Sequence, residues 1–143
     1  MISLRQAKRI FLDTAPLIYL VERNETYWNA VVELFSRIDA GGLQVVTSPV
    51  SLAECLVLPY RKGRSDLMQI FTDLIVNGEN TQFVPLDQEI AAEAAHLRGR
   101  YNLALSDAFQ AAVALATRCD VWVTNDADFK RVADLNVLLV SEL

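Results

Sequence analysis

Four acidic residues occupy points of this sequence at which a strand is predicted to end or a helix to begin. They are Asp13, Glu54, Asp107 and Asp126. The first and last follow short apolar runs typical of buried strands, and the other two lie in the opening turns of predicted apolar helices. In an α/β sheet these strand and helix ends meet at one edge, where ligands bind. Four acids gathered there would repel one another unless a cation lay between them, so the pattern predicts a divalent-metal site and, through it, phosphate chemistry.

Oxygen ligands of this kind suit Mg²⁺ or Mn²⁺, which bind a few carboxylates and complete their shell with water. Such ions activate water for attack on a phosphodiester and offset the charge that develops on the phosphate. No histidine or cysteine nucleophile is then required. The sequence has one histidine, His96, and two cysteines without CxxC or HxxxH spacing, which argues against a zinc site.

Each acid also has a purely structural explanation. Asp13 could cap the helix that follows it, Asp107 could be favoured by its helix dipole, and Asp126 could be an ordinary turn residue. Glu54 lies among apolar neighbours, where an unpaired carboxylate is costly, so it needs a metal or an arginine such as Arg61. A single shared metal site explains why all four acids lie at one sheet edge more simply than four separate structural roles do.

The apolar pattern alternates between strand-like and helix-like segments. Strands are predicted at residues 9–12, 43–47, 83–86, 120–124 and 137–140. Helices are predicted from residue 14 onward, at about 26–40, from Ser48 until Pro59 and Gly63 break the helix, at 65–76, from an Asp87 cap to about 101, and at 107–118. Strands separated by helices predict an α/β fold with a largely parallel sheet covered on both faces. The last helix is alanine-rich and apolar nearly all round, so it is predicted to be central and buried.

Length and composition predict one domain over residues 1–143 with a full apolar core. The sequence has no signal-peptide pattern and no run of about 20 apolar residues, so we expect a cytoplasmic protein without a membrane partner. The net charge of −5 is unfavourable for nucleic-acid binding, but a metal would neutralise part of it. Of the local basic clusters, Arg61, Lys62 and Arg64 are the best candidates for a phosphate contact.

Four motifs, in this order, resemble those of the PIN-domain family, and in particular of its small VapC-type toxins. They are Asp13-Thr14-Ala15-Pro16-Leu17-Ile18, Ser51-Leu52-Ala53-Glu54, Leu105-Ser106-Asp107-Ala108 and Thr124-Asn125-Asp126-Ala127-Asp128-Phe129. The resemblance extends over essentially the whole chain. It implies a Rossmann-like PIN domain with a largely parallel central sheet, and a metal-dependent ribonuclease that is the toxin of a toxin–antitoxin pair.

The resemblance also implies roles for particular residues. Asp13, Glu54, Asp107 and Asp126 would hold Mg²⁺ or Mn²⁺ and carry the catalysis. The supporting residues would be Asp128, Thr124, Asn125 and Ser51. The threonine and asparagine would shape the turn and bond to the carboxylates or to a metal-bound water. The implied partners are an RNA substrate, a small antitoxin protein and a second copy of the chain in a homodimer.

Three other functions remain to be compared with this one. A phosphoacceptor receiver domain brings an acidic pair at its first strand and a lysine at its last, and this chain has neither. A haloacid-dehalogenase-like phosphatase needs D-x-D after the first strand, where this chain has Asp13-Thr14-Ala15. A catalytically silent PIN-like interaction or regulatory module would be favoured by loss of an acid, but all four are present.

Overall fold

A computed structural model describes residues 2–143. Its strands are β1 (Arg9–Leu12), β2 (Gln44–Thr47), β3 (Thr81–Phe83), β4 (Val121–Thr124) and β5 (Val137–Leu139). Its α-helices are α1 (Thr14–Val21), α2 (Trp28–Asp39), α3 (Pro49–Arg61), α4 (Ser65–Asn77), α5 (Gln88–Tyr101) and α6 (Leu105–Ala116). Two short 3₁₀ helices follow β4 and β5, η1 (Ala127–Arg131) and η2 (Val140–Glu142).

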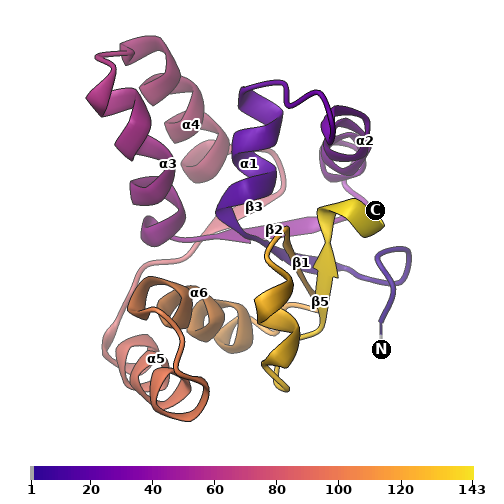
Figure 1. Cartoon of the computed structure of the whole chain (residues 1–143). Coiled ribbons are helices and arrows are strands. Elements are labelled where there is room, and N and C mark those ends of the chain that lie inside the picture. Colours follow the sequence, from indigo (N-terminus) through magenta and orange to yellow (C-terminus); the bar gives the residue numbers. More distant parts are fainter. Residues whose placement is uncertain (1) are drawn as a thin grey trace.

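Within residues 2–143 the five strands form one parallel sheet in the order β3-β2-β1-β4-β5 (Figure 1). This confirms the predicted α/β fold with a parallel sheet between helices. Over the same residues, no helix has both the length and the apolar character needed to cross a membrane.

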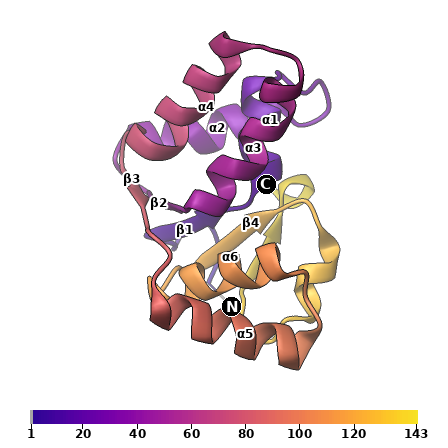
Figure 2. The ribbon, with the colours of Figure 1, turned by 90° about the vertical axis from the view of Figure 1, so that its left-hand side faces the viewer.

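Side chains alternate along β1 between the two faces of the sheet. Ile10 and Leu12 pack in a core with α1 to α4, whereas Phe11 packs in a second core with α5 and α6. Figures 1 and 2 show the same division, with α1 to α4 on one side of the sheet and α5 and α6 on the other. Phe11 stacks on Trp122 of β4 with ring centroids 4.6 Å apart. Both central strands are thus covered on each face, which explains their continuous apolar runs.

The order of the strands reverses between β1 and β4. From β1 the chain proceeds outward to β2 and β3, then returns to β4 on the other side of β1 and continues to β5. In parallel α/β sheets, ligands bind at the carboxyl ends of the strands where the order reverses. Asp13 follows β1 directly and Asp126 lies two residues beyond β4, so both stand at this point.

The helix that carries Asp107 is central, as predicted. Six of its residues, Ala108 and Gln110 to Ala114, are buried. It begins at Leu105, two residues earlier than predicted, because the Ala108 amide donates to the Ala104 carbonyl (2.9 Å) and closes a turn there. Asp107 is therefore the third residue of α6 rather than the first.

Two predicted boundaries are wrong. The third strand was expected at residues 83–86 but is Thr81–Phe83, because its partner β2 ends at Thr47, which pairs with Phe83. This edge strand is only partly buried and contains polar residues, so a search for apolar runs does not detect it. Pro59 does not end α3 either: the helix runs to Arg61, since only the bond that the proline cannot donate is lost. Gly63, at φ +62°, then takes the left-handed conformation just beyond the helix end.

Candidate active site

Asp13 lies at the carboxyl end of β1 and caps α1. Its amide donates to the carbonyl of Val123 (2.9 Å), which extends the pairing of β1 with β4. Its Oδ1 accepts from the amide of Thr14 (2.8 Å), and its Oδ2 accepts from the hydroxyl of Thr124 (2.7 Å). Burial raises the pKa of the carboxyl above its ordinary value, although both hydrogen bonds oppose the rise. Asp13 is thus a helix cap and also a buried acid that is difficult to ionise.

Thr124, the last residue of β4, connects two of the acids. Its Oγ1 donates to Asp13 and accepts from the amide of Asp126 (3.0 Å). Oδ1 of Asp126 in turn accepts from the amide of Asp128 (2.9 Å) and caps η1. The turn therefore has a local structural role, and the same bonds fix Asp126 beside Asp13.

Glu54 lies half-buried in the second turn of α3. Its Oε2 accepts from the hydroxyl of Thr14 (2.7 Å). No ion pair joins it to Arg61 among the residues that the structure describes, so of the two partners considered from sequence, the arginine is not used. Because the Thr14 amide donates to Asp13, this one threonine orients two of the carboxylates.

Asp107 lies within electrostatic range of the other acids. Burial, followed by the charges of Asp13, Glu54, Asp126 and Asp128, raises the pKa of the Asp107 carboxyl to about 6. Such coupling requires charges of like sign to lie near one another. The four predicted acids therefore lie close enough to influence one another's charge, and so does Asp128, the acid predicted to support them.

Cys55 follows Glu54 and is buried beneath the acids. Burial, together with the charges of Glu54 and Asp13, raises the pKa of its thiol to about 12. A thiol in this state stays protonated at neutral pH, so it does not act as a nucleophile. The chemistry of the site therefore rests on the carboxylates.

Ser51 belongs to a buried network that sequence reasoning missed. Its hydroxyl donates to Oε1 of Gln110 on α6 (2.8 Å), and the hydroxyl of Ser48, which caps α3, donates to the same oxygen (3.2 Å). All three side chains are fully buried. The network ties the start of α3 to α6 and thereby relates Glu54 to Asp107. A lone glutamine in the apolar stretch 108–116 was the available signal.

Among the described residues, Asn125 bonds to an aromatic residue and not, as one prediction had it, to a carboxylate. Its side-chain amide donates to the hydroxyl of Tyr19 on α1 (3.0 Å). Tyr19 also stacks on Tyr27, with ring centroids 4.8 Å apart. The bond joins the turn after β4 to α1, whose first residue orients the acids.

The donor set fits a hard divalent ion. In residues 2–143, no three acidic, histidine or cysteine side chains converge closely enough to enclose a metal ion on their own. Mg²⁺ nevertheless binds through few protein oxygens and keeps several waters, so it does not need a closed cage. The pKa of Asp107 is raised first by burial and then by the neighbouring negative charges, and a bound cation would offset those charges.

Thr124→Val is expected to remove two hydrogen bonds from the site while leaving its shape nearly unchanged. Valine has nearly the same shape but cannot bond to Asp13 or Asp126, so we expect a stability loss of about 1–2 kcal/mol. The bond from Thr124 lowers the pKa of Asp13, so its removal should raise that pKa further and move the acid limb of any pH–activity profile to higher pH. Thr124→Ser, which keeps the hydroxyl, is the control. Identical profiles for the valine variant and wild type would contradict this role.

Comparison with known proteins agrees with the geometry. A family model described as PIN domain matches residues 10–135. Similar solved structures include VapBC2 from Rickettsia felis bound to a promoter DNA fragment (TM-score 0.70, 18% identity, 92% of this chain and 98% of that chain). They also include a toxin–antitoxin complex from Klebsiella pneumoniae (TM-score 0.69, 21% identity, 94% and 99%). A third is VapC20 from Mycobacterium tuberculosis, a sarcin–ricin loop cleaving toxin (TM-score 0.72, 17% identity, 87% and 95%). At these identities the likeness concerns the fold. No curated protein matches the sequence significantly.

Proposed function

The chain belongs to the PIN-domain family, and from this premise we propose that it is a metal-dependent endoribonuclease, the toxin of a toxin–antitoxin pair. The observation that carries the proposal is the group of carboxylates at the point where the strand order reverses. The charges of four of them act on Asp107. The four acids other than Asp128 form no ion pair with a basic side chain among the described residues. Their mutual repulsion lowers the stability of the folded protein, so the arrangement is best explained by the binding of a cation.

The residues have distinct roles in this proposal. Asp13, Glu54, Asp107 and Asp126 would hold Mg²⁺ or Mn²⁺. The bound ion supplies the Lewis acidity that activates water and offsets charge on the attacked phosphate. Thr14 and Thr124 hold the Asp13 and Glu54 carboxylates by hydroxyl and amide donors, so that these acids need not reorganise when substrate binds.

Removal of the metal tests the function directly. Purified protein should cut total RNA into discrete fragments with Mn²⁺ or Mg²⁺, EDTA should abolish the cutting, and excess Mn²⁺ should restore it. Cleavage that persists in EDTA would mean that the acids do not carry the reaction. If no RNA is cut with either metal, the catalytically silent interaction module becomes the better account.

The proposed partners are a small antitoxin and a second copy of the chain, in the cytoplasm. The similar structure from Klebsiella pneumoniae is a toxin–antitoxin complex, which supports the first. Four exposed apolar side chains lie on α3 and α4, where a protein partner could cover them: Val57, Leu58, Tyr60 and Ile70. Light scattering of the purified chain tests the dimer, and a monomer at all concentrations would refute it.

A further inference from the structure

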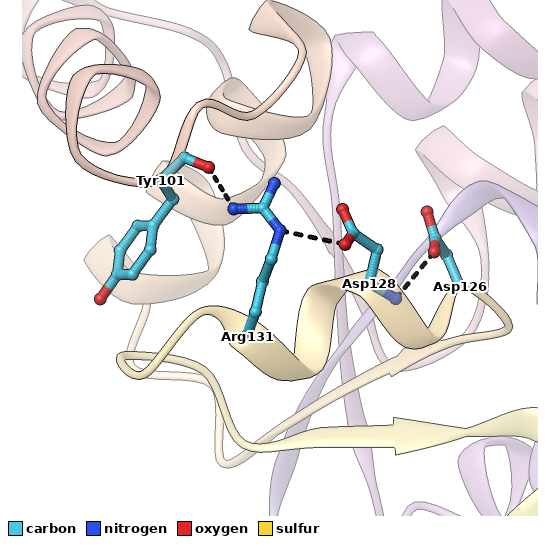
Figure 3. Close-up of polar contacts among 4 residues, drawn as sticks. All are labelled: Tyr101, Asp126, Asp128 and Arg131. Atoms are coloured by element: carbon cyan, nitrogen blue, oxygen red, sulfur yellow. Dashed lines mark hydrogen bonds and ion pairs between the residues drawn. The ribbon is translucent and has the colours of Figure 1, made fainter.

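One guanidinium lies against the group of acids. Arg131, the last residue of η1, donates from Nε to Oδ1 of Asp128 (3.0 Å) and from Nη1 to the carbonyl of Tyr101 at the end of α5. The hydroxyl of Tyr101 donates to Asp134 (2.9 Å), so Tyr101 is itself held in place. Figure 3 shows Arg131 between Tyr101 and Asp128, with Asp126 beyond.

These two bonds fix the guanidinium without using all its donors. Arginine carries five N–H groups, and among residues 2–143 no acceptor takes those of Nη2 in Arg131. The Arg131 side chain is 41% exposed, so this nitrogen can meet a ligand from solvent. In Figure 3 the guanidinium and the carboxylates of Asp126 and Asp128 rise from η1 on the same side. Arg131 thus holds a positive charge at the edge of the acids.

An RNA backbone needs a positive charge at this place. It would approach five carboxylates on a chain of net charge −5. Over the described residues, the other hydrogen bonds to these carboxylates come from hydroxyls and backbone amides, which carry no full charge. A guanidinium also matches the geometry of phosphate oxygens, so Arg131 suits a phosphate better than a lone ammonium would.

The basic cluster singled out from sequence is less well placed. Arg61 lies two helical turns beyond Glu54, at the far end of α3. Arg64 in the same cluster pairs with Asp66 through two hydrogen bonds, from Nε (2.9 Å) and from Nη2 (2.7 Å). Neither arginine is bonded to a member of the acid group among the described residues.

We propose that Arg131 binds a phosphate of the RNA backbone beside the scissile bond, through its free Nη2 group. The inference rests on the proposed function and names a substrate contact for it. Asp128 and the carbonyl of Tyr101 hold the guanidinium in place before RNA arrives, which lowers the entropy lost on binding. Asp128 is then the anchor of Arg131, and the metal is left to the other four acids.

The test is RNA binding by a protein that cannot cut. Asp107→Asn provides this background, and a labelled single-stranded oligoribonucleotide of mixed sequence is titrated at several salt concentrations. Arg131→Ala on this background should weaken binding about 10-fold at low salt. It should also reduce the slope of log Kd against log salt by about 0.7, the value for one phosphate contact with a single strand.

Lys130→Ala is the matched control, because it removes the same charge from the same 3₁₀ helix. The Lys130 ammonium pairs with Glu142 (2.9 Å) instead of an acid of the group. It should change Kd less than about two-fold and leave the slope as it was. Asp128→Asn, which keeps an oxygen to accept from Arg131, should bind RNA at least as tightly as the parent.

Three results would overturn the inference. One is an equal effect of Arg131→Ala and Lys130→Ala on Kd and on the salt slope. Another is a lowered melting temperature for Arg131→Ala with an unchanged slope, which would make Arg131 only a cap for the end of α5. If the Asp107→Asn parent binds no RNA at all, the proposed function fails as well, and this result is distinct from the first two.

Discussion

Replacing Asp107 with asparagine should abolish metal-dependent RNA cleavage while making the metal-free protein more stable at neutral pH. Asparagine keeps the size of the side chain and removes the charge that would hold the ion. Loss of a group that only orients a metal ligand already costs about 10–100-fold, so we expect loss of a ligand to cost at least about 100-fold. The fold should survive, because Asp107 is only half-buried and the neighbouring acids repel its negative charge, so that loss of this charge removes an unfavourable interaction.

The gain in stability has a defined pH dependence. The pKa of Asp107 in the folded protein is about 6, above its ordinary value of 3.8. Between these values the folded state binds more protons than the unfolded state, so ionisation of Asp107 reduces stability as the pH rises through this window. Asp107→Asn removes this loss of stability. The variant should therefore be as stable as wild type below about pH 4, and its gain in free energy of unfolding should be complete above about pH 6. Since the carboxyl is partly solvated, we expect about 1 kcal/mol, or about 2–4 °C in melting temperature.

Thermal unfolding in EDTA at about pH 4 and about pH 7.5, together with cleavage assays, would measure both effects. Asp73→Asn is the control, because Asp73 is an exposed acid on α4 outside the group. It should change neither activity nor melting temperature. An Asp107→Asn protein that still cuts RNA would remove Asp107 from the reaction, and one that unfolds would make it a structural residue.

Replacing Gln110 with alanine should lower the free energy of unfolding by about 3 kcal/mol. Gln110 is completely buried and accepts from the hydroxyls of Ser48 and Ser51. Alanine would leave both hydroxyls without their acceptor and would open a cavity between α3 and α6. Because these helices carry Glu54 and Asp107, the variant should also need more Mn²⁺ for half-maximal cleavage.

Urea unfolding followed by tryptophan fluorescence would give the stability change, and a Mn²⁺ titration of cleavage would give the second effect. Gln69→Ala is a suitable comparison, since Gln69 is an exposed glutamine on α4 that bonds to Asp73 (2.8 Å). Its cost should stay within about 0.5 kcal/mol. A Gln110→Ala protein as stable as the Gln69 variant would show that the buried network does not hold the two helices together.

The acids were predictable from sequence because each one is marked by its immediate neighbours. Asp13 follows an apolar run, and Asp107 precedes an alanine-rich one. Thr124 and Ser51 lie in the same motifs as the acids and were predicted as supporting residues. The partners of the long-range contacts, in contrast, are marked by nothing nearby. Thr14 meets Glu54 across 40 positions, Ser51 meets Gln110 across 59, and Arg131 meets Tyr101 across 30. Such pairs depend on how elements pack, and a local pattern does not contain that information.

The errors in the strands and helices have the same origin. The third strand is fixed by its pairing with β2 rather than by its own apolar residues, and it lies at the edge of the sheet. α3 continues past Pro59 because the next turn is completed by residues beyond it: the Lys62 amide donates to Leu58 (3.0 Å) and that of Arg64 to Pro59 (2.9 Å). Local rules predicted where the apolar segments are, and tertiary pairing decided where they stop.

The reversal of strand order between β1 and β4 has a consequence for the protein during its synthesis. Asp13 is synthesised well before the threonine that orients it, which lies 111 positions later. A nascent chain that ends before β4 holds Asp13, Glu54 and Asp107, but it lacks the strand that completes their surroundings. Contacts of such long sequence separation form late in folding. A chain interrupted before β4 should therefore lack the proposed nuclease activity.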